Sequence, residues 1–218
     1  MRARSLLVAA ALSATPCMAL ADDVRIIGDS IGEGLHLATG IASPANRFNV
    51  AIYTGKALDQ LKQMPRGSTV VMSLGTNDAV AGMTDQKAKI EAIAAAADAQ
   101  GVKLVWVGPP CVLTKWEDHA KALDANIAAS LQGTSVTFVS AQEPEFCAAS
   151  LHAGDGVHFT MAGYSRLWQK AATAAGIPVV VATNSPQPVH KAVTKSVKKG
   201  HKHRRPRAPQ TPHPTPTT

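Results

Sequence analysis

The chain has 218 residues, of which 45% are hydrophobic, 4% aromatic and 17% charged, and its formal net charge is +7. The charge is unevenly divided: residues 22–184 hold 12 Lys and Arg against 15 Asp and Glu, whereas residues 185–218 hold eight basic residues and no acidic one. A basic folded body is thereby excluded, because the excess of positive charge belongs to the C-terminal tail.

The N-terminal segment is typical of a secretory signal peptide. Two arginines precede an apolar run over residues 6–12, and residues 19–21 form a small-x-small site that predicts cleavage after Ala21. The alternative is a membrane anchor, but the run is far shorter than the roughly 20 residues that a spanning helix needs. We therefore predict a signal peptide over residues 1–21 and a periplasmic or secreted mature protein without a transmembrane helix.

Residues 22–184 alternate short β-rich runs with longer Ala-rich helical stretches, a pattern typical of a parallel sheet covered by helices on both faces. In chain order, the predicted strands are residues 24–27, 48–52, 69–74, 103–107 and 136–140, with a candidate edge strand at 179–182. Five strands and their helices in about 160 residues make one α/β domain.

The helices between these strands have ordinary start and stop signals. One is expected to begin near Ser30, and two more are expected over residues 84–100 and 116–132. The last helix is the best marked, because Thr160 can act as its N-cap and Gly176 can end it.

The tail, residues 185–218, differs in composition. It holds seven of the fourteen prolines and no large apolar side chain other than three valines, so it buries too little surface to offset the entropy of ordering. We predict a disordered tail, and one role open to it is binding to an anionic envelope surface, such as phospholipid, lipopolysaccharide or cell-wall polymer. A solvated extension is the alternative. Nucleic acid would also attract these cations, but export and the absence of interleaved aromatic residues disfavour it.

Two cysteines remain once the signal peptide and Cys17 are removed. Cys111 and Cys147 form an even pair in an exported protein, which favours a disulfide. The alternatives are a catalytic thiol or a metal pair, but neither cysteine has a CxxC spacing or histidine-rich surroundings.

Polar residues follow the strands at the edge where an open parallel sheet builds its sites. Ser30 comes after the first predicted strand, and Asn77 comes after the third, so we expect the two side by side. Gly55, after the second, would let a backbone N–H approach closely.

A histidine and an aspartate complete the set. Asp155 and His158 lie three residues apart in a Gly-rich loop, a spacing that can place the carboxylate against the imidazole and leave the other ring nitrogen free as a base. Together with Ser30 and Asn77, they supply the parts of a serine acyl-transfer site: a nucleophile, a base, an orienting acid and an oxyanion donor.

On these motifs the chain resembles the SGNH hydrolases, also called GDSL esterases and lipases. Four blocks appear in order: Gly28-Asp29-Ser30, Gly55, Gly75-Thr76-Asn77-Asp78 and Asp155-Gly156-Val157-His158. The resemblance covers about residues 24 to 175. It implies a three-layer α/β/α, flavodoxin-like fold with five parallel strands in the order 2-1-3-4-5, and no cofactor.

The resemblance also implies a role for each residue. Ser30 would attack an ester carbonyl, His158 would act as general base and then general acid, and Asp155 would orient His158. The oxyanion hole would consist of the Ser30 and Gly55 backbone N–H groups and the Asn77 side chain. No metal is expected, because the remaining histidines lack ligand spacing, and no nucleotide, because the glycines near Ser30 match no phosphate-binding fingerprint.

The sequence thus predicts an exported serine esterase acting on small acyl, O-acetyl-glycan or lipid esters. The short segment at residues 79–83 leaves no large lid, and the low aromatic content disfavours a long polysaccharide groove. Two alternatives stay open: an O-acyltransferase that uses the same residues, and a non-catalytic envelope-binding protein that uses the basic tail.

Overall fold

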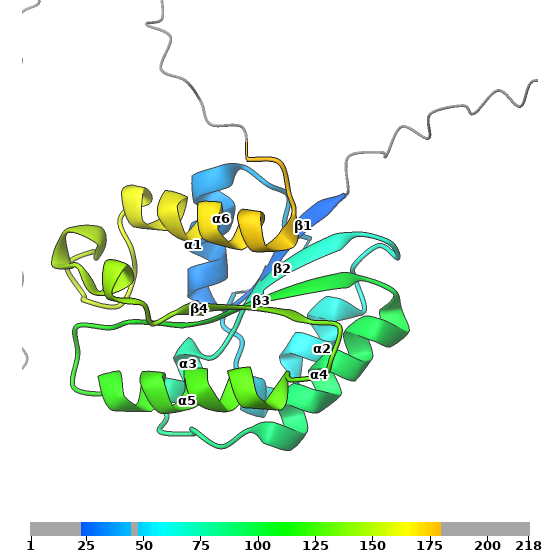
Figure 1. The fold of residues 1–218 in the computed structure, drawn as a ribbon, viewed down its shortest axis with the longest axis horizontal. Coiled ribbons are helices and arrows are strands. Elements are labelled where there is room, and N and C mark those ends of the chain that lie inside the picture. Colours follow the sequence, from blue (N-terminus) through cyan, green and yellow to red (C-terminus); the bar gives the residue numbers. More distant parts are fainter. Residues whose placement is uncertain (1–22, 45–47, 180–218) are drawn as a thin grey trace, which may run out of the picture. The chain divides into compact units, whose positions relative to one another are not determined.

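A computed structural model describes residues 23–44 and 48–179 (Figure 1). The predicted signal peptide and the predicted tail lie outside the described residues, and so do residues 180–182 of the candidate edge strand. Within the described ranges, no helix is long and apolar enough to cross a membrane.

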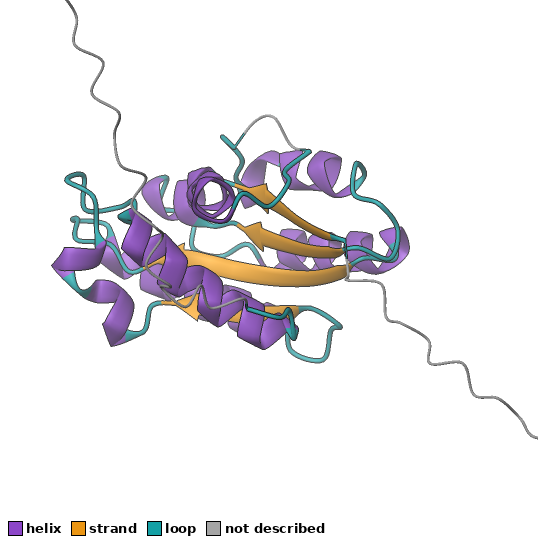
Figure 2. Ribbon diagram, turned by 90° about the horizontal axis from the view of Figure 1, so that it is seen from above, coloured by secondary structure: helices purple, strands orange, loops and turns teal. Residues whose placement is uncertain are grey.

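Four parallel strands form the sheet, in the order β1-β2-β3-β4. Their bounds are β1 (Val24–Gly28), β2 (Thr69–Ser73), β3 (Lys103–Pro110) and β4 (Thr137–Ala141). Gly28 lies opposite Ser73, and Ser73 opposite Val107. The strands point the same way in Figure 2, so their carboxyl ends meet at one edge, where parallel sheets build their sites.

Helices cover both faces of the sheet, as predicted (Figure 1). The helices α1 and α6 pack on one face, and α2, α4 and α5 pack on the other, with the short α3 against α5. Their bounds are α1 (Ser30–Thr39), α2 (Lys56–Leu61), α3 (Thr76–Val80), α4 (Lys87–Gln100), α5 (Glu117–Ser130) and α6 (Met161–Ala175). Short 3-10 turns are η1 (Ile52–Thr54), η2 (Pro144–Cys147) and η3 (Ala149–Leu151).

Each face of the sheet has its own apolar core. Ile26 and Val71 pack in the cluster that contains residues of α1 and α6, whereas Ile27 and Met72 pack in the cluster of the opposite layer. All four are fully buried. Neighbouring residues of one strand therefore face different cores, which explains why these strands are continuous apolar runs.

The helix ends follow the signals in the sequence. The Thr160 hydroxyl accepts a hydrogen bond from the Gly163 N–H at 3.3 Å, which caps α6, and Gly176 closes the helix with a φ of +69°. Gly101 closes α4 in the same left-handed conformation. These caps fix where α6 begins, and α6 follows directly after the segment that carries His158.

The structure corrects one predicted strand. Residues 48–52 form no ladder, so the sheet of the described residues has four strands rather than five. The Asp78 carboxylate accepts hydrogen bonds from the Ile52 N–H at 2.8 Å and the Tyr53 N–H at 3.0 Å, and the Asn77 amide donates to the Val50 carbonyl at 2.7 Å. Side chains thus form hydrogen bonds with backbone groups that pairing with a neighbouring strand would require. Residues 48–52 are strand 2 of the predicted order 2-1-3-4-5. Without them, predicted strands 1, 3, 4 and 5 correspond to β1, β2, β3 and β4 and lie in the observed order.

Candidate active site

The candidate nucleophile stands at a tight turn between β1 and α1. Ser30 is the first residue of α1. Gly28 has a φ of +118° and packs so closely on β2 that an added Cβ would lie 1.8 Å from the Ser73 carbonyl oxygen. The turn therefore requires glycine. The Asp29 N–H donates to the same Ser73 carbonyl at 2.8 Å, which fixes the start of α1 and the place of Ser30.

Asp29 is a fully buried carboxyl group next to the serine. One of its oxygens accepts hydrogen bonds from the Ile31 N–H and the Ser73 hydroxyl, and the other accepts from the Thr76 N–H, all at 3.1 Å. Burial raises the pKa of Asp29 to about 6, although these hydrogen bonds act in the opposite direction. Asp29 thus connects the turn that carries Ser30 to the start of α3 through hydrogen bonds.

The structure brings Ser30, His158 and Asp155 together. The His158 Nε2 atom lies 2.8 Å from the Ser30 hydroxyl oxygen, and its Nδ1 atom lies 2.6 Å from an Asp155 carboxylate oxygen. Because a carboxylate only accepts hydrogen bonds, Nδ1 carries the proton in the neutral ring and Nε2 is left as the acceptor for the serine hydroxyl. This is the protonation state that a general base needs.

The charge of Asp155 is stabilised locally. Desolvation favours its protonated form, but hydrogen bonds from the His158 ring and from the Val157 and His158 N–H groups, both at 2.9 Å, outweigh it. They lower the pKa of Asp155 to about 2. Asp155 is therefore ionised wherever the histidine acts.

The histidine is carried by a short loop, residues 153–158, which we name the histidine loop. It is closed at its base, where His152 and Phe159 form an antiparallel bridge and the Ala153 N–H donates to the His158 carbonyl at 2.7 Å. The loop thus holds the orientation of His158 through its own backbone rather than through the sheet.

A second segment braces the histidine loop from outside. Cys111, just after β3, is joined by a disulfide to Cys147, with 5.2 Å between the Cα atoms, as predicted. Two residues further on, the Leu113 N–H donates to the Gly156 carbonyl at 2.7 Å. The chain after β3 is therefore attached both to the segment after β4 and to the histidine loop.

Asn77 lies at the serine as predicted. Its amide nitrogen donates one hydrogen bond to the Val50 carbonyl at 2.7 Å, which leaves the second N–H of the amide for another acceptor. Ser30 and Asn77 line one open pocket of about 500 Å³, together with Glu33, Phe48 and Asn49. An ester bound here would meet the hydroxyl and the amide at once.

The structure does not bring Gly55 into this pocket. The Gly55 N–H points to the Ile52 carbonyl at 3.4 Å, because Gly55 ends η1 with a φ of +71°. Gly55 instead lines a separate pocket of about 260 Å³ with apolar residues that include Leu58 and Ile93. This geometry does not support the predicted contribution of its N–H to an oxyanion hole.

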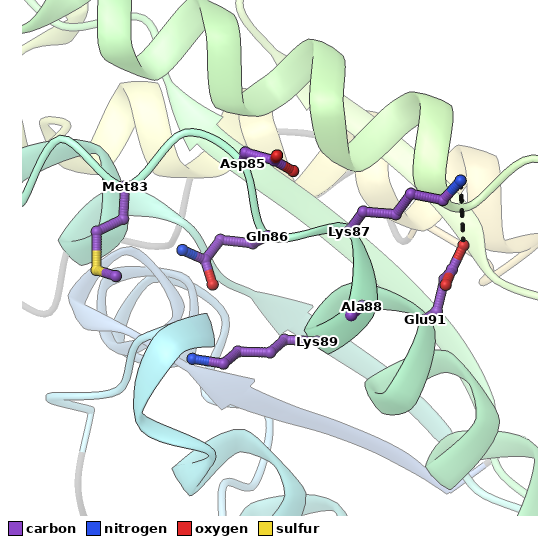
Figure 3. Close-up of a pocket in the computed structure, with 7 residues that line it drawn as sticks. All are labelled: Met83, Asp85, Gln86, Lys87, Ala88, Lys89 and Glu91. Carbon is purple, nitrogen blue, oxygen red and sulfur yellow. Dashed lines mark ion pairs between the residues drawn. The ribbon is translucent and has the colours of Figure 1, made fainter.

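A larger open pocket of about 560 Å³ lies at the start of α4 (Figure 3). It is lined by Met83, Asp85, Gln86, Lys87, Ala88, Lys89 and Glu91. The Lys87 ammonium pairs with Glu91 at 3.8 Å, and Lys89 donates to the Tyr53 carbonyl at 2.9 Å. This pocket contains neither Ser30 nor His158, so the candidate active site is the smaller pocket at the serine.

Metal-ligating residues do not cluster in the part of the chain that the structure describes. Within those residues, no group of three or more His, Cys, Asp or Glu side chains is placed to hold a metal ion. His158 contacts both Asp155 and Ser30, an arrangement suited to moving a proton.

The fold is that of the SGNH hydrolases. A candidate SGNH hydrolase from Slackia heliotrinireducens superposes with a TM-score of 0.54 at 18% identity, covering 72% of this chain and 99% of that one. The structure of TesA gives 0.54 at 19% identity, covering 69% and 96%. A mutant of Axe2, an acetyl-xylooligosaccharide esterase from Geobacillus Stearmophilus, gives 0.53 at 14% identity, covering 72% and 95%. At such identities the likeness concerns the fold.

Within that fold, the chain belongs to the DUF459 family, described as "Protein of unknown function (DUF459)", whose model matches residues 36–174. The match includes Asn77, Asp155 and His158, and it begins six residues after Ser30. No curated protein matches the sequence.

Proposed function

We propose that this protein is an exported serine esterase that cleaves carboxylic esters through an acyl-enzyme on Ser30. The observation that carries the proposal is the chain of contacts from the Ser30 hydroxyl to His158 at 2.8 Å and from His158 to Asp155 at 2.6 Å. The three residues come from sequence positions up to 128 residues apart, yet their order and distances are those of a nucleophile, a base and an orienting acid.

In the acylation step, the Ser30 oxygen bonds to the ester carbonyl carbon while its proton passes to the His158 Nε2 atom. Asp155, held ionised, stabilises the imidazolium that forms. The carbon–oxygen bond to the alcohol then breaks, and His158 returns the proton to the departing alcohol oxygen. A water molecule repeats the two steps on the acyl-enzyme, which releases the acid and restores the Ser30 hydroxyl.

Two donors are available for the oxyanion of the tetrahedral intermediate. The Ser30 N–H is at the first position of α1, so it has no partner within the helix, and the positive end of the helix dipole lies there. Asn77 lines the same pocket as Ser30, and its amide has a second N–H beyond the one that donates to Val50. Donors fixed in advance at the site of developing charge are an effective source of transition-state stabilisation. We assign the oxyanion hole to Ser30 and Asn77.

The lining of the pocket favours a small acyl group on a polar alcohol. Glu33 lies one turn along α1 from Ser30. Glu33 and Asn49 are exposed polar residues that line the pocket, and Phe48 is the aromatic residue of the lining. Such a lining offers hydrogen-bond partners to hydroxyl groups and only one large apolar side chain, Phe48, to a long acyl chain. We therefore place small acyl esters, including O-acetylated glycans, ahead of lipid esters.

The first test is hydrolysis of p-nitrophenyl acetate, butyrate and octanoate by the protein that lacks residues 1–21, beside Ser30→Ala. We expect activity that is highest on acetate and lost in Ser30→Ala. Highest activity on octanoate would contradict the substrate preference. Absence of both hydrolysis and labelling by a serine-reactive fluorophosphonate would contradict the esterase and favour a binding protein.

Hydrolysis and acyl transfer share the first covalent step, so products must separate them. Incubation of the enzyme with p-nitrophenyl acetate and a soluble sugar acceptor gives acetate alone if water is the acceptor. A dominant acetylated sugar would identify an O-acyltransferase instead.

Deleting residues 185–218 and measuring sedimentation with anionic vesicles at increasing salt tests the tail, and unchanged binding would exclude it as an anchor.

A further inference from the structure

A second histidine lies next to the candidate site and has no part in the mechanism above. His152 is buried, with 7% of its surface exposed. Its Nε2 atom lies 2.8 Å from the Cys111 carbonyl oxygen, and its Nδ1 atom lies 3.2 Å from the Ala148 carbonyl oxygen. The ring also packs on Phe159, with 4.9 Å between the ring centroids. The buried ring thus contacts carbonyl oxygens through both nitrogens and packs on an aromatic side chain.

The contacts of His152 join segments that the disulfide also joins. Cys111 is one half of the disulfide, and Ala148 directly follows Cys147, the other half. The imidazole therefore bridges the chain after β3 to the chain after β4 beside the disulfide. Both partners are carbonyl oxygens, which only accept hydrogen bonds, and the shorter of the two contacts is the one from Nε2 to Cys111.

His152 also forms the base of the histidine loop. Its backbone pairs with Phe159 in an antiparallel bridge, and the Thr160 N–H donates to the Leu151 carbonyl at 2.7 Å on one side of that bridge. On the other side, the Ala153 N–H donates to the His158 carbonyl at 2.7 Å. A displacement of the His152 ring would therefore move both ends of the loop.

We propose that His152 is a positioning residue. By hydrogen bonding to Cys111, it fixes the histidine loop against the disulfide-bonded chain after β3, so that the His158 Nε2 atom stays within hydrogen-bond distance of the Ser30 hydroxyl. This inference rests on the proposed function for its kinetic consequence, but not for its structural one. Proton transfer depends on such distances, because a base acts only within hydrogen-bond reach of the proton it removes.

Two substitutions separate the packing of His152 from its hydrogen bonds. His152→Phe keeps a ring against Phe159 and removes both polar contacts, whereas His152→Gln keeps a side-chain donor for the Cys111 carbonyl. The matched control is Gln100→Leu, which removes a hydrogen bond of 2.7 Å from a part-buried side chain to the Met64 carbonyl. Gln100 is the last residue of α4 and comes just before β3 begins. It therefore lies at the amino ends of the strands, opposite the carboxyl ends where Ser30 lies.

We expect kcat for p-nitrophenyl acetate to fall by up to about 100-fold in His152→Phe, with little change in KM, because a misplaced base slows the chemical step rather than binding. His152→Gln should recover part of kcat, and Gln100→Leu should keep the wild-type value. Hydrogen exchange at the Val157 and His158 amides, which donate to Asp155, should speed up in His152→Phe and not in Gln100→Leu.

A wild-type kcat in His152→Phe would overturn the proposal, and so would a loss of kcat that Gln100→Leu shares at equal thermal stability. If the wild-type protein neither hydrolyses esters nor reacts with a fluorophosphonate, the proposed function fails by itself. The exchange measurement then decides the role of His152, and unchanged exchange at Val157 and His158 in His152→Phe overturns it.

Discussion

The two halves of the candidate site are held in place by different means. Ser30 stands at the junction of β1 and α1, where backbone contacts to β2 and a buried carboxyl group fix the turn. His158 and Asp155 stand in a loop, and their side chains are 39% and 51% exposed. Core packing positions the candidate nucleophile, whereas a disulfide and backbone hydrogen bonds position the candidate base, with His152 proposed as a further support.

The two aspartates beside these halves show the same contrast in their electrostatics. Burial raises the pKa of Asp29 to about 6, so its charge is unfavourable and its role is to accept hydrogen bonds. Desolvation of the exposed Asp155 is outweighed by hydrogen bonds that lower its pKa to about 2, so its charge is available to a protonated histidine. The comparison predicts that replacing Asp29 acts mainly on stability and that replacing Asp155 acts mainly on rate.

The largest effect is expected for Asp155→Asn. An amide in place of the carboxylate no longer enforces the Nδ1–H tautomer of His158, so we expect kcat to fall by about 10⁴-fold at nearly unchanged thermal stability. Steady-state kinetics with p-nitrophenyl acetate and a thermal unfolding curve measure both. Asp85→Asn, at an aspartate in the pocket of Figure 3, is the control. Equal losses of rate in both variants would contradict an orienting role for Asp155.

An intermediate effect is expected when Cys111 and Cys147 are both replaced by serine. The disulfide closes a loop of 36 residues, and losing it should lower the free energy of unfolding by about 4 kcal/mol. Native-state hydrogen exchange compares the two halves of the site directly. Without the disulfide, amide exchange should increase more at Val157 in the histidine loop than at Ile31 in α1. An equal increase at both amides would show that the disulfide stabilises the domain without favouring the histidine side.

The smallest effect is expected from the pH dependence of the serine side. Because the folded-state pKa of Asp29 is raised from 3.8 to about 6, its contribution to stability is fully present below about pH 4 and is lost as the pH rises through about 6. From about pH 4 to about pH 7, wild type should lose about 2 kcal/mol of unfolding free energy relative to Asp29→Asn. Urea unfolding at both pH values measures this difference. A difference that is constant with pH would show that Asp29 is not perturbed by burial.

Much of the layout follows from local sequence signals. The apolar runs of β1, β2, β3 and β4 predict four buried strands, and a residue that directly follows a parallel strand lies at the edge where sites form. These signals predict that Ser30 and Asn77 lie side by side, and in the structure both residues line one pocket. The spacing between Asp155 and His158 predicts their contact, because three residues of turn suffice to bring the two side chains together.

Other features depended on partners distant in the sequence. The run over residues 48–52 has strand-like residues, yet Asp78 binds the Ile52 and Tyr53 N–H groups and no ladder forms there. The same arrangement ends η1 at Gly55 and turns the N–H of this glycine to the Ile52 carbonyl. A single glycine carries no signal of where its N–H points, so the sequence could not reveal this.

Asp29 and His152 show the same limit. Both are polar residues in short segments, and nothing in their neighbours along the chain indicates that they are buried. Besides near neighbours, their partners are Ser73 and Thr76 for Asp29 and Cys111 for His152, which lie 41 to 47 residues away.

The sequence by itself determined the identity and order of the candidate site residues, the edge of the sheet on which they lie and the caps that begin and end the helices, because each depends on residues close together in the chain. Only the tertiary structure decided which oxygens and nitrogens meet across the sheet edge: the 2.8 Å contact between Ser30 and His158, the burial of Asp29 and the bridge made by His152. Distances of this kind depend on how separate elements pack, and packing is a property of the whole fold.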